Sequence, residues 1–124
     1  MSHIVTISVE VRDLEAVRAA CRRLQFKEPV FGMAKLFRTT AEGWQINLPG
    51  WKYPIVCELS EGKILYDNYE GEWGEQIRLN QFLQAYSIEK TSLEARRRGY
   101  SVYEQPLSDG SVKLTINLGQ GGNV

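Results

Sequence analysis

The chain has 124 residues, in which 15 Lys and Arg balance 15 Asp and Glu, so its formal net charge is zero. A chain of this length buries roughly two thirds of the surface that its unfolded form exposes, enough for one core without disulfides or a structural metal. The balanced charge argues against a duplex-DNA binder, which normally carries a strong basic excess. No apolar run approaches the roughly 18 residues of a membrane span, so we expect a cytoplasmic protein without a membrane segment.

The first part of the chain predicts a strand followed by a helix. Apolar and polar residues alternate over residues 3–11, which is typical of a half-buried strand. Asp13 can cap a helix in which apolar residues recur every three or four positions until about Gln25. Pro29 and Gly32 are expected to mark the exit from this helix.

Two hairpins are predicted in the middle of the chain. Strands over residues 34–38 and 44–48 join through the five residues between them. Strands over residues 53–59 and 64–67 join through a tight turn.

The last part predicts a loop, a long helix and a final hairpin. Residues 67–74 are dense in turn-forming residues, whereas 75–98 contain no Pro or Gly and end before Gly99, a natural C-terminal cap. Strands over residues 100–104 and 112–118 form the last hairpin, and 119–124 form a flexible tail with little apolar content.

The order β-α-β-β-β-β-α-β-β predicts a single α+β domain over residues 1–118, a mostly antiparallel sheet with two helices on one face. A weak internal repeat indicates an alternative, in which the chain consists of two related halves that each contain a strand, a helix and a hairpin. Each helix ends in a run of arginines, and each following hairpin contains Ile-Asn-Leu, at 46–48 and 116–118. The spacing differs between the two copies, so both interpretations stay open.

No catalytic set is recognisable in the sequence. His3 is the only histidine, which excludes a site built on two histidines within one chain. Cys21 and Cys57 each fall among apolar neighbours, as reduced core thiols do. We therefore expect no cofactor, no metal and no enzyme. The carboxylates that an enzyme, the less favoured alternative, would use are Glu58, Asp67 and Glu72.

The loop at 67–74 is the most unusual stretch, because it combines carboxylates with large aromatics just before a helix. One interpretation is structural, since acids offset the positive end of the helix dipole and Asx residues close turns. The other is a protein-binding surface, in which the aromatics supply contact area and the acids select a basic or metal-bearing partner. The predicted partner-binding residues are Tyr66, Asp67, Asn68, Tyr69 and Trp73.

A second candidate site combines aromatic and basic residues. The aromatics near Pro49-Gly50 either cap the core or rim a pocket between the two halves. Arginines at a helix end are favoured by the helix dipole, yet converging guanidinium groups can also bind an anion. The predicted residues of this anion or ligand site are Trp44, Trp51, Tyr53, Arg96 and Arg97.

Motifs along nearly the whole chain carry a family resemblance. The most specific are Asp67-Asn68-Tyr69, Trp73-Gly74 and the helix exit over 94–100, while residues 31–54 match less well. With these motifs the chain resembles the hypothetical chloroplast reading frame thirty-five family, small proteins of unknown function from cyanobacteria, plastids and other bacteria. The resemblance implies a cytosolic or stromal single-domain protein and supplies no catalytic residue or cofactor.

The sequence thus predicts a non-enzymatic protein-binding or accessory module that acts through residues 66–75 and has an unidentified protein partner. The alternative is a small-molecule or anion-binding domain with a pocket between the two halves. Although the net charge is zero, the charged residues are unevenly distributed: acidic residues are concentrated over 58–75, and arginines lie at the ends of both helices. The oligomeric state is left open.

Overall fold

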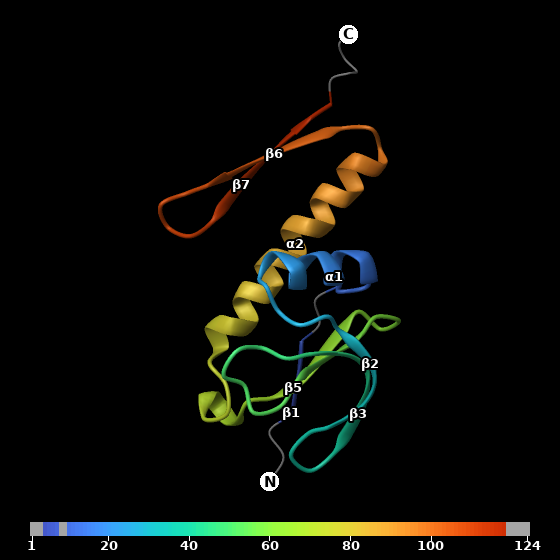
Figure 1. The fold of residues 1–124 in the computed structure, drawn as a ribbon, viewed down its shortest axis with the longest axis vertical. Coiled ribbons are helices and arrows are strands. Elements are labelled where there is room, and N and C mark those ends of the chain that lie inside the picture. Colours follow the sequence, from blue (N-terminus) through green and yellow to red (C-terminus); the bar gives the residue numbers. More distant parts are fainter. Residues whose placement is uncertain (1–3, 8–9, 119–124) are drawn as a thin grey trace. The chain divides into compact units, whose positions relative to one another are not determined.

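The chain has an α+β fold with the predicted order of elements (Figure 1). The computed structural model describes residues 4–7 and 10–118. Its elements are β1 (Ile4–Ile7), α1 (Leu14–Arg23), β2 (Val30–Lys35), β3 (Thr40–Ile46), β4 (Ile55–Glu58), β5 (Lys63–Asp67), η1 (Tyr69–Gly71), α2 (Gln76–Arg97), β6 (Ser101–Pro106) and β7 (Val112–Asn117).

The strands form two antiparallel sheets rather than one. Five strands pair in the order β1-β5-β4-β3-β2, and β6 and β7 pair only with each other. The sequence predicted all of these strands but placed the last hairpin in the main sheet. Alternation shows that a segment forms a strand, whereas it does not specify which strand it pairs with.

The first hairpin begins four residues earlier and ends two residues earlier than predicted. Leu36 N donates to Thr39 O at 2.8 Å, so the turn lies at Phe37-Arg38. Gly32 does not break the chain, because it lies inside β2 and pairs with Gly43; its φ of 159° is one that residues with a side chain rarely adopt. Gly43 lies in β3 and not in the turn. A Cβ there would lie 2.6 Å from Cys57 O, so the close approach of β4 requires glycine at this position.

Helix α1 has the predicted N-cap, and its buried side faces the sheet. The Asp13 carboxylate accepts from Glu15 N at 3.0 Å and from Ala16 N at 3.3 Å. Arg18 of α1 lies over the Trp44 ring at 5.3 Å, which places α1 on the face of the sheet that holds Trp44. The core residues of that face, fully buried and aligned by strand register, are Ile46, Ile55, Cys57 and Ile64.

Helix α2 begins and ends close to where the sequence places it. Gly99 follows its last turn with φ 82°, and Tyr100 N donates to Ala95 O at 2.9 Å, which satisfies an end carbonyl. Near its middle, Tyr86 Oη accepts from Arg12 N and Asp13 N, each at 3.2 Å, and this fixes the start of α1. The described helices do not combine the length and apolarity needed to cross a membrane.

The chain divides into two compact units inside α2. The first extends to Tyr86 and contains the five-stranded sheet, α1 and the beginning of α2. The second begins at Ser87 and contains the rest of α2 and the hairpin β6–β7. The predicted tail, 119–124, lies outside the described residues, as do 8–9 of the predicted first strand.

Candidate functional site

The loop after β5 has a buried base. Asp67 is fully buried, and its Oδ1 accepts from Tyr69 N at 3.3 Å. Asn68 is almost as deeply buried, and its Nδ2 donates to Gly74 O at 3.3 Å. The Asn68 carbonyl also accepts from Gly71 N at 3.0 Å and Trp73 N at 2.9 Å. Four hydrogen bonds therefore fix the loop from beneath.

The tip of this loop has an unusual backbone. Tyr69 and Glu70 both have positive φ, at 48° and 53°, and Gly71 follows at 97°. Non-glycine residues in this region cost on the order of 1 kcal/mol each and persist only when the surroundings impose them. The bonds at the base impose them here, and they hold the Tyr69 side chain 40% exposed.

Trp73 is the centre of an aromatic cluster in the first unit. Its ring centroid lies 4.8 Å from Tyr69, 5.0 Å from Phe37 and 5.6 Å from Tyr53. Lys52 Nζ lies 4.9 Å from the Trp73 ring, and Lys52 N donates to Trp73 O at 2.8 Å. We call these five residues, Phe37, Lys52, Tyr53, Tyr69 and Trp73, the Trp73 patch.

Trp51 lies near the same loop but has structural contacts. Its ring packs directly on Gly74, where a Cβ would overlap the indole, and meets the Tyr66 ring edge-on at 5.6 Å. Its Nε1 donates to Glu75 O at 3.0 Å, next to the first residue of α2. Trp51 thus fixes the start of the helix.

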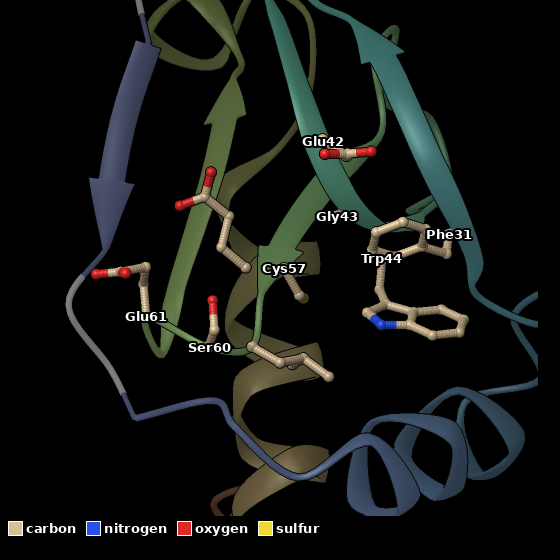
Figure 2. Close-up of a pocket in the computed structure, with 9 residues that line it drawn as sticks. Phe31, Glu42, Gly43, Trp44, Cys57, Ser60 and Glu61 are labelled. Carbon is tan, nitrogen blue, oxygen red and sulfur yellow. The ribbon is translucent and has the colours of Figure 1, made fainter.

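Trp44 lies elsewhere on the sheet, beside a surface hollow of about 390 Å³. Its ring meets Phe31 edge-on at 5.4 Å, and Figure 2 shows both rings at one end of the hollow with Ser60 and Glu61 at the other. Cys57 lies between them, fully buried. The hollow therefore combines aromatic walls with a carboxylate at its far end.

The five predicted partner-binding residues divide into two groups. Tyr66, Asp67 and Asn68 are buried, so their side chains support the loop from within. Tyr69 and Trp73 are at least partly exposed and contact each other. Alternation and turn residues locate such a loop, but they do not indicate which of its side chains point inward.

The residues of the alternative site have different neighbours within their own units. Tyr53 contacts Trp73, Trp51 contacts Tyr66, and Trp44 contacts Phe31. Arg96 and Arg97 belong to the second unit, where Arg97 Nη1 pairs with Glu94 at 3.3 Å. A pocket between two halves stays a prediction.

Cys21 and Cys57 are both buried free thiols. Burial raises the pKa of Cys21 to about 11 and that of Cys57 to about 12, so both stay protonated at neutral pH. Among residues 4–7 and 10–118, no three His, Cys, Asp or Glu side chains are placed to hold a metal ion.

Two features were missed by reasoning from the sequence. One is the exposed apolar surface of β2, and the other is a groove of about 480 Å³ in the second unit. The run Val30-Phe31-Gly32-Met33 was a usable signal for the first, since apolar residues crowd one short strand. This signal was missed because Gly32, in the middle of the run, was interpreted as a chain break.

Comparison with known proteins yields no relative: no family model, no curated protein and no solved structure matches this chain.

Proposed function

We propose that this chain is a non-enzymatic protein-binding module whose contact surface is the Trp73 patch. The observation that supports this most strongly is the position of Tyr69. Its ring is 40% exposed, stacks on Trp73, and is held there by a backbone of positive φ. Strained backbone of this kind is concentrated at functional sites.

The patch suits binding because it is ordered before a partner arrives. Large aromatic side chains supply contact area and have few rotatable bonds, so fixing them costs little entropy. The hydrogen bonds of Asp67 and Asn68 fix the loop backbone in advance. A partner then loses less binding free energy to ordering than it would against a mobile loop.

The charges near the patch indicate the chemistry of the partner. Glu70 and Glu72 are exposed on the same loop as Tyr69, while Lys52 already occupies a position over Trp73. We propose that the partner places an apolar group against Tyr69 and a basic group near Glu70 and Glu72.

The test replaces Tyr69 without altering the backbone it requires. Tyr69→Asn removes the ring, and Asn tolerates positive φ better than Ala does. The matched control is Tyr103→Asn, because Tyr103 is an aromatic of β6 that is 64% exposed and lies outside the patch. Affinity capture from cell lysate should lose its specific proteins with Tyr69→Asn and keep them with Tyr103→Asn. Identical captured sets at unchanged melting temperature would contradict the proposal.

A second candidate is an amphipathic-anion binder that uses the groove in the second unit. Its lining includes the apolar side chains of Tyr100, Ile116 and Leu118. Lys90 Nζ pairs with Glu94 at 2.8 Å, which leaves the Arg98 guanidinium as the excess cation of the lining. Decanoate at about 100 times its dissociation constant should add about 2.7 kcal/mol of stability, and decanol should add less. No shift with decanoate would exclude this candidate.

We also propose cytoplasmic location and membership of the hypothetical chloroplast reading frame thirty-five family. The support is that the most specific shared motifs, Asp67-Asn68-Tyr69 and Trp73-Gly74, carry the loop that the site depends on.

A further inference from the structure

Strand β2 is an open edge of the five-stranded sheet. It is the last strand in the sheet order and pairs only with β3. Because Leu36 bonds to Thr39 across the turn, the even-numbered residues of β2 direct their backbone groups to β3. The N–H and C=O groups of Phe31, Met33 and Lys35 therefore point away from the sheet, where another strand can pair with them.

This edge is apolar and little protected. Val30, Phe31 and Met33 are 62%, 55% and 62% exposed. Natural sheet edges are normally blunted by charges, proline or bulges, because an open apolar edge invites pairing with another chain. In β2 the protecting charge, Lys35, stands only at the last position.

Two hollows lie beside β2. The first, of about 390 Å³, includes Phe31 and Trp44 (Figure 2), and the second, of about 530 Å³, includes Met33 and Ala41. Phe31 pairs with Trp44 and Met33 pairs with Glu42, so these four side chains lie on one face of the sheet, while Ala41 lies on the other. Alternate side chains of an added strand would lie on the face of Phe31, Met33 and Glu42.

The charge of both hollows favours a basic occupant. Glu42 and Glu58 line each of them, and Lys and Arg line neither. In the part of the chain that the structure describes, neither carboxylate forms an ion pair. Arg18, Lys35 and Lys63 are nearby cations: Arg18 lies over the Trp44 ring, Lys35 ends β2, and Lys63 is the register partner of Glu58. All three lie outside the two linings.

We propose that β2 is a docking edge for an extended, basic polypeptide segment, which adds as a sixth strand and places Lys or Arg side chains near Glu42 and Glu58. Backbone hydrogen bonds to Phe31, Met33 and Lys35 give the affinity, and the carboxylates give the selectivity. This surface does not depend on the Trp73 patch, so either proposal can fail alone.

The probe is a fluorescent peptide of about seven alternating lysines and valines, roughly the length of one strand. Fluorescence anisotropy should show binding to the full chain that weakens at least about tenfold when glutamate replaces lysine. Glu42→Gln combined with Glu58→Gln should weaken the lysine peptide, and added salt should do the same. Equal binding of both peptides would overturn the proposal.

Variants at Met33 test strand pairing itself. Met33→Pro removes the outward N–H at an edge position that accepts proline, whereas the matched control Met33→Thr keeps it. With melting temperatures compared first, Met33→Pro should weaken the peptide about tenfold and Met33→Thr much less. Equal loss in both variants would contradict pairing through the backbone.

Peptide N-methylation gives a test that leaves the protein unchanged. Alternate N–H groups of a strand point to opposite edges, so only one set of the peptide's amides faces β2. Methyl groups on that set block pairing, and methyl groups on the other set leave it intact. One methylated peptide should therefore bind like the parent and the other should not, and equal binding of both would overturn the proposal. The remaining possible occupant of the edge is a second copy of this chain. Analytical ultracentrifugation tests it, because a dimer that dissociates on Met33→Pro would assign the edge to that second copy instead.

Discussion

Trp51 and Trp73 are both half-buried and both adjoin the loop after β5, yet their neighbours differ. Trp51 rests on Gly74 and Tyr66 and donates its indole N–H to a backbone carbonyl near the start of α2. Trp73 is surrounded by side chains of the surface, including the exposed Tyr69. The comparison teaches that contacts decide the role of an aromatic residue: one tryptophan holds the loop in place, and the other belongs to the surface that the loop presents.

The largest expected effect comes from filling the space that the Trp51 ring occupies. Gly74→Ala places a Cβ inside the indole and should destabilise the fold by about 2–3 kcal/mol, as overpacking does. Urea unfolding measures it. The control is Gly50→Ala, which meets no atom within 4 Å and carries only the strain of a φ of 77°. An effect of Gly74→Ala no larger than that of Gly50→Ala would contradict the structural role of Trp51.

Alkaline pH tests how completely water is excluded from the core of the five-stranded sheet at Cys57. The pKa of Cys57 is raised to about 12 by burial, so the folded chain holds this proton more tightly than the unfolded chain does. Its stabilising contribution is complete below about pH 9 and declines by up to about 1.4 kcal/mol per pH unit above that.

Urea unfolding at pH 8, 9.5 and 11 checks the Cys57 effect, with Cys57→Ala as the comparison. The variant is less stable at pH 8, because it loses packing, but its stability should fall less steeply at high pH. Parallel curves for the two proteins would show that the thiol is not deeply buried.

A smaller effect follows from the indole hydrogen bond. Trp51→Phe keeps most of the ring and removes the donor to Glu75 O, so it should cost about 1 kcal/mol. Trp44→Phe is the matched control, because Trp44 has a ring contact with Phe31 and a cation contact with Arg18. Thermal unfolding measures the stability of both variants. If both lose the same stability, the indole hydrogen bond of Trp51 contributes nothing that Trp44 lacks.

The smallest effect on stability is expected at Tyr69, the exposed residue that contacts Trp73. Tyr69→Asn should change the free energy of unfolding by no more than about 0.5 kcal/mol, because the ring is partly exposed and Asn tolerates the backbone. A loss above about 2 kcal/mol would place Tyr69 with Trp51 as a structural residue.

The sequence predicted best where local chemistry decides. Asp13 and Gly99 mark the ends of the two helices because a cap depends on a few adjacent residues. The hairpin β2–β3 was misplaced because Gly32 and Gly43 resemble turn residues, although both lie inside paired strands, where Gly43 allows a close approach of β4. Such an approach is a tertiary contact that local pattern does not contain.

The candidate site was predicted in outline only. The sequence left two interpretations of Asp67 and Asn68 open, turn closure and partner contact, and their burial favours turn closure. Asx residues suit both places, since the same side chain can cap a buried turn or contact solvent. The partners of Trp73, such as Phe37, lie far away in the sequence, so only the folded chain brings them together.

The most direct test of the central claim is crosslinking from the patch itself. A photoreactive amino acid in place of Tyr69 should trap a specific protein in cells, whereas the same group in place of the more exposed Tyr103 should not. An excess of the unmodified chain should compete with the crosslink, and Trp73→Ala introduced beside it should abolish the crosslink. The same crosslinked proteins from both positions, or none from position 69, would contradict the account.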